Sequence, residues 1–416
     1  MRYIDIFAGC GGMSLGLHKA NLKGIFAIEK SSMAFETLKF NLIDKNSHFS
    51  WIDWLQKKEY DINEVLNNFK KELISLRGKV DLVVGGPPCQ GFSLAGRRNE
   101  KDQRNKLIDS YLEFIKNVEP NFLLFENVKG FGVGFKKKNG DRGIPYSQHV
   151  MDGLNALGYV VKPKIIDFSK FGVPQRRNRF IIVAVKESLS KDNDFFERLE
   201  KERITFLEEK GLSQNISVGD AIGDLLKKNG TMKSLKFPRF KEGKYSSPNG
   251  NYQKLMRKSS NNLPTSHRFA NHNENTVEKF KIFLQEATRN TNVSSEIKKR
   301  FNLKKHCVIP LCKDSDSPTL TTLPDDYIHY CEPRILTVRE YARIQSFPDD
   351  FEFQGKYTTG GKNRRIEVPR YTQIGNAIPP LFGEIAGRTI EKWNKELQKS
   401  KSEIKVSEKV KEEVLA

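Results

Sequence analysis

The feature that most constrains this chain is an alternation, over its first 186 residues, between short apolar runs and segments of helical periodicity. Such alternation is typical of a doubly wound α/β sheet, in which helices connect successive strands. Six runs are predicted to be strands, at residues 3–7, 24–29, 80–84, 122–125, 159–166 and 179–185. The intervening helices are predicted at residues 13–20, 32–41 and 107–118.

Turn-forming or polar residues follow three of these strands, at 9–12, 85–88 and 126–127. In open α/β sheets, ligands bind in the crevice outside the carboxyl ends of the strands. The three clusters are therefore predicted to face one crevice.

The composition and the pattern of the sequence change near residue 187. From there to about 333 the chain is rich in Lys, Asn, Ser and Gly, with scattered aromatic residues and no βα alternation. This pattern predicts a separate and less regular domain. A regular pattern is visible again further on, where a helix is expected at 338–345. The stretch 371–380 is expected to open another helix that runs to about 392. Residues 393–416 carry mixed charge and are expected to form a frayed helix or a solvated tail.

Composition limits the partners and the compartment. The formal net charge is +20, from 71 Lys and Arg against 51 Asp and Glu, which favours a polyanionic partner, although a basic solubilising surface gives the same count. No apolar run approaches the length of a membrane span, and the N-terminal residues lack the layout of a signal peptide. Five cysteines, an odd number, are typical of free thiols in a reducing compartment. A cytoplasmic protein is expected.

The first segment that carries chemistry is the glycine-rich turn after the first strand. Such a turn lets backbone N–H groups and a helix N-terminus approach a ligand closely, through Gly9 and Gly11. Glu29 ends the second predicted strand, where an acid commonly accepts ribose hydroxyls. Ser14 replaces the third glycine of the dinucleotide pattern. A nucleoside-containing cofactor is predicted, a nicotinamide is not excluded, and a turn that needs glycine only for packing remains an alternative.

The second segment, Gly-Gly-Pro-Pro-Cys-Gln-Gly-Phe-Ser at 85–93, presents Cys89 after a buried strand. A thiol is a nucleophile only as the thiolate, and a free thiol has a pKa near ~8.5, which a cation or a helix N-terminus would lower. A buried and inert role fits Cys10 better than it fits Cys89, because two prolines and two glycines are a poor way to build a core.

Two further segments supply charge. Glu126 ends an apolar strand, where desolvation would let its carboxyl group donate a hydrogen bond or proton near neutrality, although a solvated strand end is the alternative for a single Glu. Arg177 and Arg179 are two residues apart near the last strand, so they share a face and can orient a carboxylate or hold a phosphate. A basic surface position suits Arg176 better.

These four segments, in this order, resemble the motifs of the cytosine-5 DNA methyltransferase family, of the single-chain bacterial restriction–modification type. Two further stretches agree, Arg-Ile-Leu-Thr-Val-Arg-Glu-Tyr-Ala-Arg-Ile-Gln-Ser-Phe-Pro at 334–348 and Gln-Ile-Gly-Asn-Ala-Ile-Pro-Pro at 373–380. The resemblance covers the chain except for about 187–315 and the tail. The Pro-Pro-Cys-Gln, Glu-Asn-Val and Gln-Arg-Arg-x-Arg elements in series are diagnostic, whereas none would be alone.

The resemblance implies a fold and a reaction. It implies a Rossmann-like S-adenosylmethionine-dependent domain at 1–186, completed by 371–392, with a smaller, irregular target-recognition domain at 187–370 and a charged tail at 393–416. Cys89 would add to carbon 6 of a cytosine flipped out of the duplex, and Glu126 would hydrogen-bond ring N3 and the exocyclic amine. Arg177 and Arg179 would position that glutamate and the base. No metal is required.

The resemblance also implies a cofactor site and partners. The matched cofactor positions are Phe7, Gly9, Gly11, Glu29, Pro88, Leu107 and Asn376, and Asp53 is the candidate for the acid near the adenine. Double-stranded DNA is the expected substrate, read through phosphates and base edges by the small domain. The enzyme is expected to act as a monomer, with a cognate restriction endonuclease, where one exists, acting as a separate protein.

Three alternatives remain open at this point. One branch of the same family modifies tRNA, but the 147 residues between 187 and 333 favour DNA, because tRNA enzymes leave little room for a recognition domain. A catalytically inactive paralogue that only binds DNA would be signalled by loss of the cysteine, the glutamate or the arginines, and all are present. A nicotinamide oxidoreductase would explain the glycine turn but not the Pro-Pro-Cys loop.

Overall fold

A six-stranded sheet forms the centre of the molecule in the computed structural model, which describes residues 1–88, 107–133, 145–257, 263–360, 363 and 366–415. The strand order is β2-β1-β3-β4-β6-β5. The strands are β1 (Arg2–Ile6), β2 (Lys23–Ile28), β3 (Leu82–Val84), β4 (Phe122–Val128), β5 (Tyr159–Asp167) and β6 (Asn178–Lys186). β6 pairs antiparallel with both of its neighbours, β4 and β5, and the other pairs of strands in this sheet are parallel. The α/β class and the six predicted strands are confirmed.

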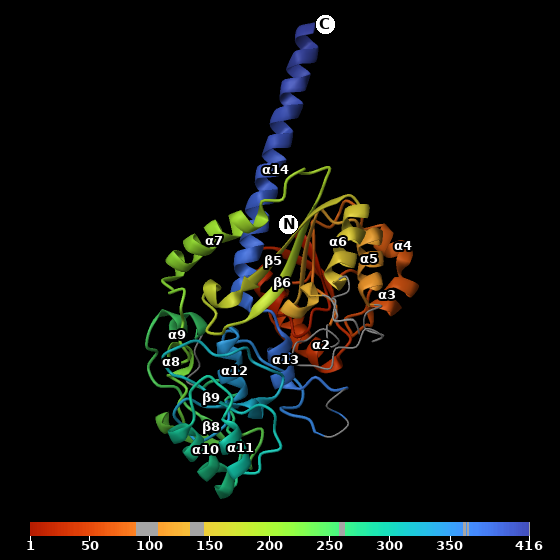
Figure 1. Ribbon diagram of the computed structural model, residues 1–416. Coiled ribbons are helices and arrows are strands. Elements are labelled where there is room, and N and C mark those ends of the chain that lie inside the picture. The colour runs from red at the N-terminus through yellow and green to blue at the C-terminus, as the bar shows by residue number, and fades with distance from the viewer. Residues whose placement is uncertain (89–106, 134–144, 258–262, 361–362, 364–365, 416) are drawn as a thin grey trace, which may run out of the picture.

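The sheet is buried on both faces, which is why its strands are apolar runs rather than alternating patterns. In β3, Leu82 and Val84 belong to one hydrophobic cluster and Val83 to the other, as the period of two in a strand requires. Helices α3 (Ile62–Asn68), α4 (Lys70–Ile74), α5 (Leu107–Val118) and α6 (Tyr146–Ala156) cover one face. Helices α1 (Gly12–Lys19), α2 (Ser32–Leu38) and α14 (Pro380–Leu415) cover the other (Figure 1).

The predicted helices are present with two changes. The helix expected at 32–41 is α2 followed by a π-helical turn, η1 (Lys39–Asp44). The helix expected from 371 to 392 is two helices, α13 (Arg370–Asn376) and α14, since Pro379 and Pro380 cannot continue the hydrogen-bond ladder of α13. The helix expected at 338–345 is present as α12 (Val338–Ile344), whereas α3, α4, α6 and the helices between β6 and α12 were not predicted from the sequence.

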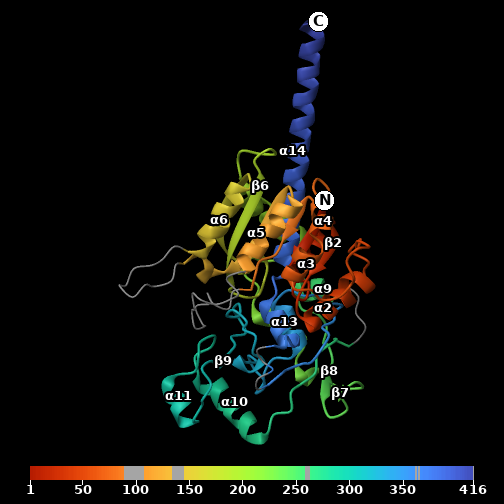
Figure 2. The same ribbon diagram turned by 90° about the vertical axis from the view of Figure 1, so that its right-hand side faces the viewer.

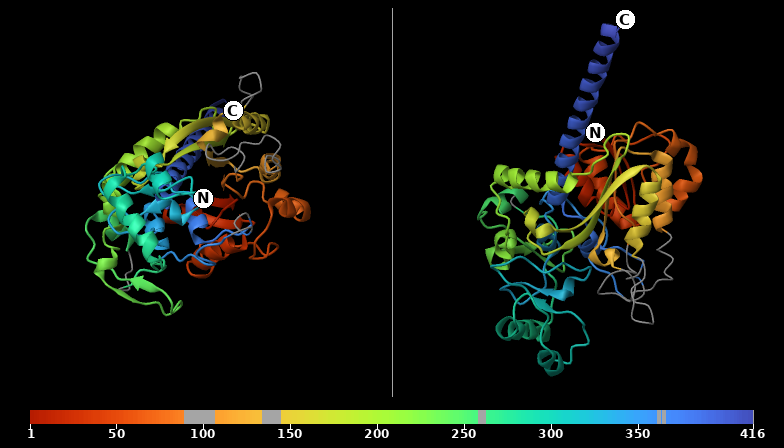
Figure 3. Two further views of the ribbon diagram at one scale, coloured as in Figure 1. Left: turned by 60° about the horizontal axis from the view of Figure 1, so that its bottom comes forward. Right: turned by 45° about the horizontal axis from the view of Figure 1, so that its top comes forward.

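Helix α14 lies directly against α1, so the end of the matched segments completes the first domain. A Cβ atom on Gly16 would lie 2.5 Å from the carbonyl oxygen of Pro380, so only glycine allows the two helices to approach this closely. The same helix continues well past residue 392 and projects from the body of the molecule (Figures 1 and 3).

The expected start of a solvated tail at residue 393 is wrong. Trp393 is 1% exposed and its ring packs against those of Phe122 and Phe195. Leu397 also packs against the core. The mixed charge of the segment concealed its two anchoring apolar residues, and α14 therefore loses its contacts with the body only beyond Leu397.

The region after β6 begins with α7 (Phe195–Lys210), which lies alongside α14 and is joined to it by ion pairs such as Lys392–Glu202. The further elements are α8 (Val218–Ile222), η5 (Lys227–Asn229), β7 (Thr231–Lys233), β8 (Lys241–Gly243), α9 (Asn251–Met256), α10 (Glu274–Glu286), α11 (Ser295–Arg300), β9 (Ile309–Pro310), η6 (Pro324–Asp326), β10 (Tyr327–Ile328) and α12 (Val338–Ile344). Most of these elements gather at the end of the molecule opposite the projecting part of α14 (Figure 2). One hydrophobic cluster extends from the sheet into this region, so the predicted boundary at 186/187 does not mark a break in packing.

No helix in the described ranges is both long enough and apolar enough to cross a membrane.

Candidate functional site

The glycine-rich turn after β1 is held by the acid that follows β2. The backbone N–H of Gly9 donates to Glu29 Oε2 at 2.8 Å, and the N–H of Ser31 donates to Oε1 at 2.7 Å. Phe7, Gly9 and Gly11 all have positive φ, of 59°, 57° and 89°. The strained Phe7 marks the point where the chain leaves the strand sharply. The structure thus brings together four of the residues predicted to bind a cofactor.

The two glycines of this turn have different surroundings. A Cβ atom on Gly11 would lie 2.9 Å from Leu42 Cδ1, so Gly11 faces the core and shapes the turn. At Gly9 a Cβ atom would have no neighbour within 4 Å, so this glycine leaves open space in front of the loop. Burial raises the pKa of Glu29, while the N–H groups of Ser31 and Gly9 oppose that rise.

A buried acid lies beneath the turn. Asp5 is 1% exposed and accepts a hydrogen bond from Ser14 Oγ at 2.5 Å. Burial raises the pKa of Asp5 to about 7, since the Ser14 hydroxyl only partly compensates and the nearby Glu29 carboxylate adds repulsion. Ser14 occupies the position where the dinucleotide pattern has its third glycine, so its hydroxyl has a structural use that the sequence did not reveal.

The loop after β3 is fixed against its neighbouring strands. A Cβ atom on Gly85 would lie 1.7 Å from the Ile6 carbonyl oxygen, and one on Gly86 would lie 2.0 Å from the Glu126 carbonyl oxygen. Asn127 Nδ2 donates to the carbonyl oxygen of Pro87 at 3.1 Å. The backbone immediately before the predicted nucleophile is therefore held beside Glu126. Cys89 itself lies outside the described residues.

Glu126 and Arg179 form an ion pair across two adjacent strands. Arg179 Nε lies 2.8 Å from Glu126 Oε1, and the two side chains are 12% and 16% exposed. Burial lowers the pKa of Arg179, and the Glu126 carboxylate opposes that shift. Glu126 does not end its strand as expected, because β4 continues to Val128 and pairs with β6 along that extension. The carboxylate is thus fixed by sheet pairing and by a cation.

Arg177 has different partners from those the sequence suggested. Its Nη2 donates to the carbonyl oxygens of Gly375 at 2.9 Å and Ala377 at 3.3 Å. No hydrogen bond joins it to Glu126 among the described residues. Burial lowers the pKa of Arg177 well below its usual range, reinforced by the neighbouring Arg179 guanidinium. Arg177 therefore holds the turn on either side of Asn376, whereas Arg179 alone pairs with the glutamate.

Two buried glutamines that the sequence analysis did not single out extend this arrangement. Gln175 Nε2 donates to Gln345 Oε1, and Gln345 Nε2 donates to the Ala377 carbonyl oxygen at 2.5 Å. Gln175 Oε1 accepts from the N–H of Leu320 at 2.9 Å. The signal was present, because each glutamine lies inside a matched motif, but partners that lie 32, 145 and 170 residues apart cannot be read from spacing.

The remaining predicted cofactor residues surround the same edge of the sheet. Pro88 is exposed at the end of the β3 loop, and Leu107 is half-buried at the start of α5. Asn376 is exposed at the end of α13, and the chain just after it touches the glycine turn, since a Cβ atom on Gly12 would lie 2.3 Å from the Ile378 carbonyl oxygen. Asp53 is exposed in a turn after β2 and makes no hydrogen bond to the described residues of this group.

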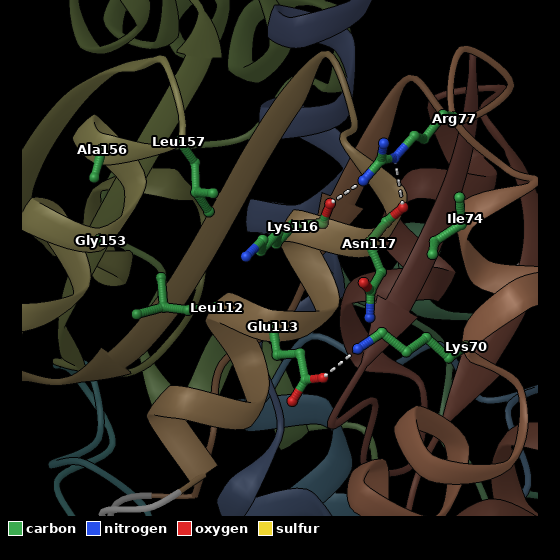
Figure 4. A pocket seen from close by; sticks show the side chains of 10 residues that line it. All are labelled: Lys70, Ile74, Arg77, Leu112, Glu113, Lys116, Asn117, Gly153, Ala156 and Leu157. Carbon is green, nitrogen blue, oxygen red and sulfur yellow. Dashed lines mark hydrogen bonds and ion pairs between the residues drawn. The ribbon is translucent and has the colours of Figure 1, made fainter.

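Figure 4 shows a hollow of about 530 Å³ on the outer helical face, lined by residues of α4, α5 and α6. Three of its ionic groups are paired or turned to backbone: Lys70 pairs with Glu113 at 3.5 Å, and Arg77 donates to the carbonyl oxygens of Lys116 and Asn117. No predicted site residue lines it, so the candidate site is the edge of the sheet and not this hollow. Across the described ranges, no group of three or more His, Cys, Asp or Glu is placed to hold a metal ion.

Comparison with known proteins gives consistent results. The family model described as C-5 cytosine-specific DNA methylase matches residues 1–392. The type II methyltransferase M1.HphI of Haemophilus parahaemolyticus is 30% identical, over 95% of this chain and 87% of its own length. The type II methyltransferase M.DdeI of Desulfomicrobium norvegicum is 31% identical, over 94% of this chain and 88% of its own. A crystal structure described as that of a DNA modification methyltransferase encoded within an E. coli prophage shares the fold, with a TM-score of 0.62 and 21% identity over 94% of this chain and 99% of that one.

Proposed function

The chain belongs to the C-5 cytosine-specific DNA methylase family and is a DNA cytosine-5 methyltransferase, and we propose that it methylates a flipped cytosine of duplex DNA through a covalent adduct with Cys89. The methyl donor is S-adenosylmethionine, which supplies an electrophilic methyl group when bound. The observation that carries the proposal is the arrangement at the ends of β3 and β4, where the backbone that leads to Cys89 is held against Glu126.

The surroundings of Glu126 suit the activation of cytosine. Arg179 occupies Oε1, and Oε2 has no partner among the described residues, so one carboxyl oxygen can face the ring N3 and exocyclic amine of the base. Attack of the Cys89 thiolate on carbon 6 pushes electron density into the ring, and a hydrogen bond or proton at N3 stabilises that charge. Carbon 5 then becomes an enamine carbon that takes the methyl group. Loss of the carbon 5 proton breaks the C6–S bond and releases Cys89.

The cofactor site fits a nucleoside with a cationic sulfur. The open space at Gly9 admits a ligand close to the backbone, and the Glu29 carboxylate, already held by two N–H groups, is placed to accept ribose hydroxyls. We assign Phe7, Pro88, Leu107 and Asn376 to the walls of this site, and Gly11 to the shape of its turn. Asp53 remains the proposed adenine contact.

Arg177 is a positioning residue in this scheme rather than a base contact. Its guanidinium, together with Gln345, fixes the carbonyl groups that flank Asn376, and Arg179 keeps the glutamate oriented. The two arginines thus serve the two halves of the reaction, one the methyl donor and the other the base.

We assign target recognition to residues 187–370, whose basic surface suits phosphate contacts. The relatives named as type II methyltransferases support a role in a restriction–modification system, in which this chain acts in the cytoplasm as a monomer and protects DNA from a separate nuclease.

The test is transfer of a labelled methyl group from S-adenosylmethionine to duplex DNA and, in parallel, to tRNA. Label at cytosine carbon 5 in one recurring DNA context, mapped by bisulfite sequencing, is expected. A duplex with 5-fluorocytosine at that position should trap a protein–DNA adduct that survives denaturation, because fluorine cannot leave as a cation. Cys89→Ala should form no adduct while still binding the cofactor. Label in tRNA alone, or an adduct in the alanine variant, would overturn the proposal.

A further inference from the structure

The hairpin formed by β7 and β8 carries the most exposed large apolar side chain in the described part of the chain. Leu235, in the loop between the two strands, is 90% exposed. The loop that presents it is closed by hydrogen bonds from the N–H of Ser234 to the Phe240 carbonyl oxygen at 3.0 Å and from the N–H of Phe237 to Ser234 Oγ at 3.1 Å. These hydrogen bonds hold Leu235 out from the body of the molecule on a closed loop, so the side chain is not carried on a frayed end.

The hairpin is strongly basic. Five exposed cations flank Leu235 within residues 231–244, and none forms an ion pair with a described residue: Lys233, Lys236, Arg239, Lys241 and Lys244. The single acid of this stretch, Glu242, accepts a hydrogen bond from Ser234 Oγ at 2.7 Å. The cationic surface continues into a neighbouring hollow of about 640 Å³ whose lining includes Lys227 and Lys228. The charge complements a polyanion and argues against a second copy of the same basic surface.

An arginine fixes the base of the hairpin. The guanidinium carbon of Arg268 lies 4.0 Å from the ring centroid of Phe240, 3.6 Å from that of Tyr357 and 4.8 Å from that of Phe237. Arg268 is joined to β8 by an antiparallel bridge to Glu242, and its neighbour His267 is bound to Thr337 Oγ1 and the Leu225 carbonyl oxygen. Stacking of this kind pre-organises a guanidinium and stiffens what it touches.

We propose that the β7–β8 hairpin is a DNA-contacting wedge, in which the flanking cations bind phosphates and Leu235 enters a groove of the duplex. Arg268 is its positioning residue and holds the hairpin rigid through the three rings. Proteins that contact DNA grooves use apolar wedges supported by cations in this way. The inference rests on the proposed function for its partner, duplex DNA, and adds the element that meets it.

The experiment compares affinity for a duplex that the wild type methylates, measured by fluorescence anisotropy over a range of salt concentrations. Leu235→Ser should weaken binding roughly tenfold without changing the salt slope, because it removes an apolar contact. Lys233→Ala and Lys236→Ala should each lower the salt slope by about 0.9 per lost phosphate contact. Arg268→Lys should weaken binding and remove the benefit of Leu235, so that Leu235→Ser has little further effect in that background.

Matched controls separate the hairpin from general surface effects. Ile204→Ser removes an apolar side chain that is 48% exposed on α7, and Lys395→Ala removes an exposed cation on α14; both should leave affinity unchanged. If the wild type methylates DNA and the hairpin variants bind as tightly as it does, the hairpin proposal fails while the proposed function stands. If the wild type transfers no methyl group to DNA, the proposed function fails first. Loss of self-association in Leu235→Ser, with DNA affinity intact, would overturn the wedge in favour of an interface between copies.

Discussion

Charged side chains are buried in two regions: around helix α12, and at the floor of the candidate site, which is formed by Asp5, Glu126 and Arg177. The two regions differ in how the buried charges are paired and hydrogen-bonded. Around α12, Arg343 is fully buried between Asp349, at 2.6 Å from its Nε, and Asp224, at 3.1 Å from its Nη1. Arg334 and Glu340 form a two-point pair with both distances at 2.7 Å. Each charge there has an opposite charge and several hydrogen bonds.

On the floor of the site the charges are incompletely satisfied. Within the part of the chain that the structure describes, Asp5 has a hydroxyl and no cation, and Arg177 binds backbone carbonyls and leaves its Nε without a partner. Glu126 uses one carboxyl oxygen for Arg179. The contrast extends to proton affinity: burial raises the pKa of Asp5 to about 7, whereas Arg334 outweighs burial and lowers the pKa of Glu340 to about 2. Saturated networks make a rigid support, while unused hydrogen-bonding capacity marks the place where a ligand binds.

The largest expected effect is on stability, from breaking the saturated network. Arg343→Met keeps much of the side-chain volume but removes the shortest ion pairs of two buried carboxylates. Of the cations that the structure describes, Asp224 then keeps only Arg257 at 3.5 Å and Asp349 only Arg339 at 3.7 Å, and the free energy of unfolding should fall by about 3–5 kcal/mol. Urea unfolding at neutral pH measures it. Arg300→Met is the matched control, since the Arg300–Glu286 pair is about half exposed and should contribute under about 1 kcal/mol. Equal losses in the two variants would contradict the comparison.

The next effect is on activity, with stability preserved. Glu126→Gln keeps the shape and an acceptor for Arg179 but removes the carboxylate, so kcat/KM for methyl transfer should fall about 10²–10³-fold. The free energy of unfolding should change by about 1 kcal/mol or less, because a neutral acceptor still faces Arg179 beside an accessible site. A large loss of stability with proportionate loss of activity would place Glu126 with the saturated network instead.

The sequence predicted the floor of the candidate site better than it predicted the ion-pair network around α12. The six strands, the glycine turn and the place of Glu29 at a strand end follow from local periodicity and from the rule that strand ends share one edge, which needs no knowledge of distant partners. The pairing of Arg179 with Glu126 was implied by the family resemblance and not by the pattern of strands. By contrast, Arg177 meets Gly375 across 198 residues, and Arg343 meets Asp224 across 119. Such contacts depend on the packing of irregular segments, and the helices α7 to α11 lacked the strong βα alternation that identified the sheet.

The two buried acids should respond to pH in opposite directions. The pKa of Asp5 is raised in the folded state from its ordinary value of 3.8 to about 7, so its contribution to stability is complete below about pH 3.8 and is lost as pH rises to 7. The pKa of Glu340 is lowered from 4.5 to about 2, so its contribution is complete above pH 4.5 and is lost as pH falls toward 2.

Asp5→Asn isolates the pH-dependent contribution of Asp5 to stability, because the amide does not titrate and keeps an oxygen that can accept the hydrogen bond from Ser14. Between pH 4 and 7, the wild type should lose stability relative to Asp5→Asn with a slope of at most one proton, about 1.4 kcal/mol per pH unit. Urea unfolding of both proteins across this range measures the difference. Parallel curves would mean that Asp5 has a cation or donor that compensates its burial.

The smallest expected effect on stability comes from removing the projecting end of α14. This one helix has a packed part and a solvated part, so the two can be compared directly. Trp393 is buried at the end of the packed half, whereas the described side chains from Gln398 to Glu403 are exposed. Removal of residues 404–416 should therefore change the free energy of unfolding by less than about 0.5 kcal/mol and leave methyl transfer unchanged. Trp393→Ala should cost about 3–5 kcal/mol, because it empties a site between Phe122 and Phe195. A truncation as damaging as that substitution would show that the distal half of α14 has a structural partner, and the boundary between packed and solvated helix would then lie beyond residue 404.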